Sequence, residues 1–287
     1  MPLLIRVLWL GFVLLPAGLT AMGAERINVY DRASLQKRQP ILIAHRGGVV
    51  TTDAPECSLQ ALRLAAEHGY QMVELDIQET IDHIPVIFHD RDMKEACGLD
   101  KRIADFTVDE VTKIFLNQPE KTTPSDQPIC TLEAALSLCE ELNLGVMLDI
   151  KWEGSREWFN RIVDGIEKHG LGQSTVTITR YPLADEILKG KVMFRISFED
   201  VLKVDYMQPV DVRGQFWFGW PRHITNDMVK EFQAKGALVI PSINVFHYPP
   251  ETHMERARRD IERMKQAGVD AYQIDSVYEP FFKELFP

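Results

Sequence analysis

Past residue 40 the chain alternates short apolar runs with amphipathic helical patterns, and this alternation constrains the fold more than any other feature of the sequence. The apolar runs are rich in Val, Ile and Leu, as expected for strands buried on both faces of a parallel sheet. Candidate strands lie at 41–45, 72–77, 85–89, 145–151, 175–179, 192–197, 237–243 and 271–275, with a weaker candidate at 215–218. The clearest helical patterns lie at 58–68, 132–142, 156–168, 225–235 and 251–266.

Strands that alternate with helices predict a parallel sheet. About eight strands within about 250 residues favour closure of that sheet into a single TIM-type (β/α)8 barrel, which we expect to span residues 40–287. An open doubly wound sheet is the alternative. No G-x-G-x-x-G or P-loop motif follows a candidate strand, which weakens the nucleotide-binding form of that alternative.

The connection between the second and third candidate strands is unusually short. It comprises residues 78–84, whereas a parallel crossover needs about a dozen residues or more. We therefore expect a hairpin with its turn at Asp82–His83, a register that places Asp76 opposite His89. Residues 91–130 contain no strong strand pattern and are expected to form a small insertion after the third strand.

The N-terminus has the pattern of a secretory signal peptide. One basic residue, Arg6, precedes an apolar run over 7–19, and small residues follow at Ala21, Gly23 and Ala24. We expect a signal peptide over residues 1–24 and hence a periplasmic or secreted protein. An uncleaved membrane anchor is the alternative, although the run is shorter than the roughly 20 residues of a spanning helix.

The formal net charge of the chain is -10. An acidic surface repels the nucleic-acid backbone, so we expect no nucleic-acid partner. This charge leaves room for one phosphoester in a locally basic pocket. The four cysteines, Cys57, Cys97, Cys130 and Cys139, match no zinc-ligand spacing. Their pairing stays open between a Cys97–Cys130 disulfide and buried free thiols.

Carboxylates inside apolar strands are the first sign of a functional site, because a buried charge without a partner is costly. Glu74 and Asp76 lie in the second candidate strand, and Asp149 and Lys151 lie near the end of the fourth. Side chains two residues apart on a strand point the same way. Three carboxylates converging on a barrel mouth predict a hard divalent cation, Mg²⁺ or Ca²⁺, while salt bridges to Arg46 and Lys151 are the structural alternative.

Two histidines end two other candidate strands. His45 ends the first and His89 ends the third. A pair of histidines beside a metal suits general acid–base catalysis near neutral pH. Arg46 offers a planar fork for phosphate oxygens and Lys151 a point charge. Together these residues suit in-line attack on a phosphodiester.

Several segments resemble the glycerophosphodiester phosphodiesterase family, the PI-phospholipase-C-like TIM-barrel phosphodiesterases, in their order and spacing. They are AHRGG, APECSLQAL, VELDIQETIDHIPVIFHD, PICTLEAAL, VMLDIK and AGVDAYQID. The resemblance is strong over residues 40–151 and weaker over 175–287. It implies a metal-dependent hydrolase that cleaves small glycerophosphodiesters to glycerol 3-phosphate and an alcohol.

The resemblance also implies a role for each matching residue. It makes His45 and His89 the acid–base pair, Glu74, Asp76 and Asp149 the ligands of Ca²⁺ or Mg²⁺, Arg46 and Lys151 the phosphate-binding residues, and Glu56 a neighbour of the metal and the substrate hydroxyls. Glu56 could instead cap the helix that begins near Ser58. The chain departs from the family at Cys57 for Asn, Ser58 for Thr, Met147 for Asn and Asp149 for the commoner Glu.

The aromatic segment 215–220 has two interpretations. It is either barrel core or a wall for the leaving group, with Trp217 and Trp220 able to touch a lipid or membrane surface. Two alternative functions remain: a lipid phosphodiesterase of the lysophospholipase D or sphingomyelinase D type, and a non-catalytic phosphoester-binding barrel. A zinc amidohydrolase would want an H-x-H motif on the first strand, which His45-Arg46-Gly47 does not supply.

Overall fold

The computed structural model describes residues 25–120, 122–179, 181–196 and 212–287. The expected signal peptide, residues 1–24, lies outside these ranges. Within them, no helix combines the length and the apolar character that crossing a membrane requires.

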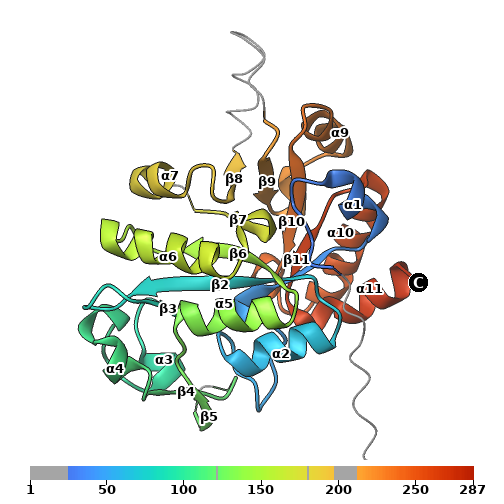
Figure 1. Cartoon of the computed structure of the whole chain (residues 1–287). Coiled ribbons are helices and arrows are strands. Elements are labelled where there is room, and N and C mark those ends of the chain that lie inside the picture. The colour runs from blue at the N-terminus through green and yellow to red at the C-terminus, as the bar shows by residue number, and fades with distance from the viewer. Residues whose placement is uncertain (1–24, 121, 180, 197–211) are drawn as a thin grey trace, which may run out of the picture.

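The described part of the chain contains eight parallel strands that close into a barrel (Figure 1). Closure is direct, because Ala44 pairs with Val73 on one side and with Ile274 on the other. The TIM-type barrel prediction is therefore confirmed, and the open doubly wound sheet is wrong. In order around the barrel the strands are β1 (Leu42–Ala44), β2 (Met72–Glu79), β6 (Gly145–Ile150), β7 (Thr175–Thr177), β8 (Met193–Ile196), β9 (Gln215–Gly219), β10 (Leu238–Ile243) and β11 (Tyr272–Ile274).

Helices surround the strands, as Figure 1 shows. Several begin at a Ser or Thr whose side-chain oxygen accepts a backbone N–H of the first turn, as Ser58 and Ser155 do, which satisfies a donor that the helix itself leaves unpaired. Their apolar faces pack on the outer faces of the strands and form the largest core of the molecule. The helices around the barrel are α2 (Leu59–Glu67), α5 (Leu132–Glu141), α6 (Arg156–Lys168), α7 (Pro182–Leu188), α9 (Asn226–Ala234), α10 (His253–Ala267) and α11 (Glu279–Leu285).

Two strand candidates have positions in the sheet that differ from the expected ones. The weak candidate at 215–218 is β9, a full member of the barrel between β8 and β10. The candidate at 85–89 is β3 (Pro85–Ile87), which pairs antiparallel with β2 and lies outside the barrel. The short connection therefore forms the expected hairpin, since a parallel crossover does not fit in it.

The register of this hairpin differs from the prediction by one residue. Ile77 pairs with Ile87, so Asp76 lies opposite Phe88 and not opposite His89. The turn is centred on Asp82 alone, because the chain reverses through a five-residue loop in which the Thr80 N–H donates to the carbonyl of residue 84 at 3.2 Å.

The described residues of the expected insertion, 91–120 and 122–130, form a small unit beside the β2–β3 hairpin (Figure 1). It contains α3 (Lys94–Cys97), α4 (Val108–Val111), and an antiparallel pair of strands, β4 (Phe115–Asn117) and β5 (Pro124–Pro128). Met93, Ile103 and Leu116 pack with Val86 and Phe88 in a core of their own. This separate core anchors the segment that follows β3, and that segment carries His89.

The interior of the barrel is apolar at one end and polar at the other. Met72, Met147 and Phe216 belong to a buried cluster inside the strands. Residues 25–37 close this end, with α1 (Arg32–Lys37) and the buried Ile27 and Val29. Because strand side chains alternate faces, the inward residues farther along the same strands form the opposite, open end.

All four cysteines are free thiols, so the disulfide alternative is wrong. Cys57, Cys130 and Cys139 are buried in the core between helices and strands. They behave there as small apolar side chains.

Candidate active site

A pocket at the carboxyl ends of the strands joins residues from both halves of the barrel. Its volume is about 340 Å³, and its lining includes His45, His89, Asp149 and Lys151 on one side and residues of β8 to β11 on the other. TIM-barrel enzymes bind their substrates at this end, where loops follow the strand ends. This pocket is the candidate active site.

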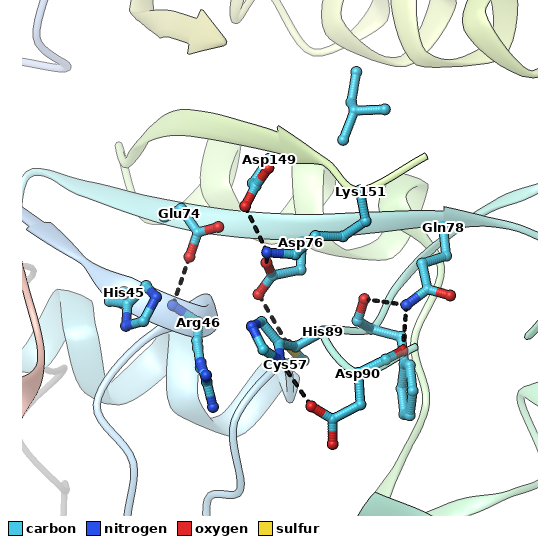
Figure 2. A network of polar contacts seen from close by, with 12 residues as sticks. His45, Arg46, Cys57, Glu74, Asp76, Gln78, His89, Asp90, Asp149 and Lys151 are labelled. Atoms are coloured by element: carbon cyan, nitrogen blue, oxygen red, sulfur yellow. Dashed lines mark hydrogen bonds and ion pairs between the residues drawn. The ribbon is translucent and has the colours of Figure 1, made fainter. Parts of the chain in front are cut away.

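Three carboxylates form an acidic cluster at the pocket (Figure 2). Glu74 and Asp76 point the same way from β2, and the parallel register places Asp76 beside Asp149 of β6. One carboxylate oxygen from each residue lies within 4.8 Å of the other two. Glu74 and Asp76 are fully buried, and Asp149 borders the pocket. The three residues predicted as metal ligands therefore lie together with suitable spacing for a cation.

Lys151 is the positive charge of this cluster. Its Nζ lies 2.8 Å from Asp76 Oδ1 and 2.6 Å from Asp149 Oδ2. Burial, together with Asp76 and Asp149, raises the pKa of Glu74 well above its ordinary value. Burial and Asp76 also raise the pKa of Asp149. Although burial alone would raise it, the pKa of Asp76 is held below its ordinary value by Lys151 and His89. The single ammonium of Lys151 therefore compensates only part of the negative charge of the three carboxylates.

The loop after β1 carries a strained backbone toward this cluster. Arg46 adopts the left-handed conformation (φ 53°, ψ 43°), and its N–H donates to Glu74 Oε2 at 2.7 Å. Such strain at a non-glycine residue is maintained by its surroundings and concentrates at functional sites. Gly48 allows the turn, because a Cβ there would lie 2.0 Å from the carbonyl oxygen of Ala61 in α2.

His45 is held by the carboxylate of Asp275, which directly follows β11. Its Nδ1 lies 2.6 Å from Asp275 Oδ1, and Asp275 Oδ2 accepts the Val245 N–H at 2.5 Å. Burial would raise the pKa of Asp275, but the hydrogen bond and charge of His45 hold it below its ordinary value. The contact fixes the ring with Nδ1 toward the carboxylate, as in other carboxylate–histidine pairs.

His89 is held in a similar way from the other side of the cluster (Figure 2). Its Nδ1 lies 2.8 Å from Asp90 Oδ1. Gln78, buried at the end of β2, donates from Nε2 to the carbonyl oxygens of Phe88 at 2.9 Å and Asp90 at 2.7 Å. These two bonds fix the backbone on either side of His89.

Glu56 pairs with Arg46, with Oε2 2.8 Å from the guanidinium. The alternative role of Glu56 as a helix cap is wrong, because Ser58 accepts the first-turn N–H of α2. Cys57 directs its Sγ toward Asp76 Oδ2 at 3.7 Å, a weak hydrogen bond. Asp76 therefore has a poor donor on this side.

The opposite wall of the pocket is aromatic. Trp220 follows β9, and its ring centroid lies 4.2 Å from that of His247. Phe246 lies at the rim, 60% exposed, with its ring 5.9 Å from that of His45. Burial, partly opposed by Asp275, lowers the pKa of His247 to about 4, so this ring is neutral at neutral pH.

For Trp217 the structure supports the barrel-core interpretation over the lipid-facing one. Trp217 lies on the outer face of β9, 5% exposed, with its ring 6.4 Å from that of Phe232 in α9. Neighbouring residues of a strand face opposite sides, so Phe216 and Phe218 point into the barrel while Trp217 points under the helix. Trp220, past the end of the strand, does line the pocket.

The structure brings the predicted residues together around the pocket and the acidic cluster, and adds residues that sequence reasoning missed. Arg46 and Lys151, predicted to bind phosphate, contact Glu56 and the acidic cluster respectively. The missed residues are Asp275, Gln78 and the buried amides of Asn244 and Gln273. Gln78 was detectable, because it continues the two-residue spacing of Glu74 and Asp76.

Comparison with known proteins gives a consistent result. The model of the Glycerophosphoryl diester phosphodiesterase family matches residues 45–278. Glycerophosphodiester phosphodiesterase 1 of Mus musculus is 37% identical over 129 residues, which are 43% of this chain and 38% of that protein. The match thus spans well under half of the length of this curated relative.

Solved structures of the same fold cover nearly the whole chain. A glycerophosphoryl diester phosphodiesterase from Parabacteroides distasonis has a TM-score of 0.71 at 20% identity, covering 92% of this chain and 94% of that one. An Oleispira antarctica phosphodiesterase in complex with the product sn-glycerol-3-phosphate has a TM-score of 0.63 at 22% identity, covering 85% and 96%. At these identities the likeness establishes the fold.

Proposed function

The chain belongs to the glycerophosphoryl diester phosphodiesterase family, and we propose that it hydrolyses small glycerophosphodiesters to glycerol 3-phosphate and an alcohol with the help of a divalent cation. One observation carries this proposal: two histidines, each held through Nδ1 by a carboxylate, line one pocket with Asp149, which belongs to a cluster of three carboxylates. The product held by the Oleispira protein of the same fold, sn-glycerol-3-phosphate, supports the product assignment.

The histidines provide the proton transfers. With Nδ1 directed at Asp275 or Asp90, each ring keeps Nε2 for the substrate. One histidine takes a proton from the attacking water as the water oxygen bonds to phosphorus. The other donates a proton to the alcohol oxygen as the bond from phosphorus to that oxygen breaks. Such general acid–base catalysis contributes about 10²–10⁴ in rate.

The acidic cluster fits a divalent cation. Its donors are all carboxylate oxygens, which select Mg²⁺ or Ca²⁺ over zinc. Glu74 and Asp149 also have raised pKa values, since burial and the neighbouring carboxylates disfavour their charged forms. Glu74, Asp76 and Asp149 would hold the ion. When bound, it would supply positive charge to the phosphoryl oxygens.

The cationic side chains bind and orient the substrate. Arg46 borders the acidic cluster through its backbone, and its guanidinium provides two donors for phosphate oxygens. Glu56, paired with Arg46, provides an acceptor for the glycerol hydroxyls. Lys151 balances the carboxylates and adds a point charge beside the phosphate.

The proposal is tested by product analysis. The full chain is assayed on glycerophosphocholine and on lysophosphatidylcholine, with EDTA and then with excess Ca²⁺ or Mg²⁺. We expect glycerol 3-phosphate from the first substrate, its loss in EDTA, and its recovery with added metal. His45→Ala and His89→Ala, assayed in parallel, should release almost none.

Two outcomes would contradict the proposal. Turnover of the lysolipid alone would assign the protein to the lipid-cleaving type. Absence of turnover of either substrate, with metal bound, would favour the non-catalytic binding barrel.

A further inference from the structure

The candidate pocket extends beyond the acidic cluster onto the second half of the barrel, where its lining has a different chemistry. Three polar side chains, Ser242, Asn244 and Gln273, line it there while being 3%, 1% and 3% exposed. Ser242 on β10 pairs with Gln273 on β11 in the register, and Asn244 directly follows β10. Buried polar groups at a pocket are expensive unless something hydrogen-bonds to them.

Two of these side chains lack a good partner. The Nδ2 of Asn244 is buried and makes no hydrogen bond. The Nε2 of Gln273 points to Met147 Sδ at 3.8 Å, and a thioether is a weak acceptor. Nearly all buried polar groups in proteins are satisfied, so these amide donors indicate a ligand with oxygen acceptors.

The rim above these amides consists of aromatic rings. Phe246 and Trp220 line the pocket with the neutral His247 between them, their centroids 4.5 Å and 4.2 Å from that of His247. Ring edges and faces of this kind pack against the C–H groups of a ligand. Amides together with aromatic rings suit a molecule that has both hydroxyls and an apolar carbon skeleton.

The lining does not suit a cationic alcohol such as choline. Among the described residues that line the pocket itself, Asp149 is the sole carboxylate, and it is paired with Lys151 at 2.6 Å. The guanidinium of Arg222 lies 3.9 Å from the ring centroid of Trp220, so a cation there would meet a positive charge. An acyl chain would leave the amides of Asn244 and Gln273 without partners.

We propose that this half of the pocket is a subsite for a polyol leaving group, a cyclitol or a sugar alcohol, and that Asn244 and Gln273 select it. The inference rests on the proposed function, since it specifies the alcohol of the same diester. Hydroxyl oxygens of the polyol accept hydrogen bonds from the two amides, and a further polyol hydroxyl hydrogen-bonds to the Ser242 hydroxyl. Its C–H faces pack against the aromatic rim.

The test compares two diesters that share the glycerol phosphate and differ in the alcohol. We expect the full chain to hydrolyse glycerophosphoinositol with a kcat/KM at least tenfold above that for glycerophosphocholine. Asn244→Ala and Gln273→Met should each lower this ratio at least fivefold. Asn160→Ala, an exposed position on α6, is the matched control and should keep the ratio.

An equal or inverse preference in the wild-type protein would overturn the subsite. An equal loss on both substrates in Asn244→Ala and in Gln273→Met would also overturn it, because these residues would then serve the shared part of the diester.

Calorimetry separates failure of the subsite from failure of the proposed function. His89→Ala is titrated with each diester. If no diester is hydrolysed by the wild-type protein, tighter binding of glycerophosphoinositol than of glycerophosphocholine still supports the subsite, and equal binding or none overturns it.

Discussion

The two halves of the barrel share one architecture but present different kinds of side chain at the barrel mouth. From β1 to β6 the mouth carries charged side chains, nearly all of them in ion pairs or hydrogen bonds with one another. From β9 to β11 it carries amides, a serine and aromatic rings. The first half holds charge at fixed positions, which a reaction on a phosphodiester needs. The second half offers shape and hydrogen bonds, which recognition of a neutral group needs.

The difference is also one of support. His45 and His89 each contact a carboxylate through Nδ1. His247, on the other wall, contacts rings, and burial lowers its pKa to about 4. A histidine that transfers protons near neutral pH has to change its charge there, and a ring with a pKa of about 4 does not. The proposed function therefore gives histidines a chemical role in one half, while the histidine of the other wall packs against rings.

The largest expected effect comes from removing a histidine of the first half. His45→Ala or His89→Ala should lower kcat/KM by about 10²–10⁴, because each loses one proton transfer. His223→Ala, on the opposite wall of the pocket, is the control and should change kcat/KM less than about tenfold. Steady-state kinetics on one diester measures all three. Comparable losses in the three variants would remove the distinction between the halves.

The next effect concerns positioning by Asp275. Asp275→Asn should lower kcat on the order of 10–100-fold with little change in KM, because the His45 ring loses its charged partner. The pH–rate profile should shift as well, which a merely structural role would not produce. Asp270→Asn is a matched control: this buried residue of the same chain segment pairs with Arg32 at the closed end of the barrel. If the two variants lost kcat alike, Asp275 would be structural.

A smaller effect is expected at Gln78. Gln78→Leu removes two buried hydrogen bonds and should lower the free energy of unfolding by about 1–3 kcal/mol. It should also lower kcat, because the backbone on either side of His89 is released. Urea unfolding and kinetics measure the two effects. Gln71→Leu, just before β2 at its other end, should leave kcat unchanged, and a loss of kcat there would contradict the assignment.

The smallest effect is a pH dependence of stability from His247. The pKa of His247 is about 4 in the folded protein, lowered mainly by burial, and about 6.5 in the unfolded chain. The unfolded chain therefore binds the proton more tightly between these values. The stabilisation is complete above pH 6.5 and is lost as the pH falls toward 4. Because the ring is only partly buried, we expect about 1 kcal/mol.

His247→Gln should flatten the pH dependence in that window. Urea unfolding of both proteins at pH 7 and pH 4.5 measures the change. The same slope with pH in the variant would show that another group is responsible.

The strands and the acidic cluster were predictable because they depend on local rules. Apolar runs gave the strands, and the two-residue spacing put Glu74 beside Asp76 on one face. Parallel pairing of β2 with β6 then brought Asp149 to the same place. The weak segment 215–218 was harder, because it is short and flanked by Gly214 and Gly219, and the pairing with the neighbouring strands β8 and β10 decides its state.

Contacts that depend on chain closure were not predictable. Asp275 meets His45 because β11 pairs with β1, a contact across 230 positions of the sequence. The predicted hairpin register was wrong by one residue. The length of the loop around Asp82 sets this register, and the hydrophobic pattern does not. The inference about Asn244 and Gln273 also needed the structure, since the sequence does not show that an amide lacks a good hydrogen-bond partner.

The account depends most on the claim that the carboxylates of the first half bind one divalent cation. Titration of Mg²⁺ and of Ca²⁺ into the metal-free full chain by calorimetry tests this directly. Asp149→Asn keeps the shape of the side chain and removes its charge. We predict one site for at least one of the two ions in the wild-type protein and in Asn244→Ala, and a loss of at least tenfold in affinity in Asp149→Asn. Equal affinity in Asp149→Asn, or no binding of either ion to the wild-type protein, would contradict the account.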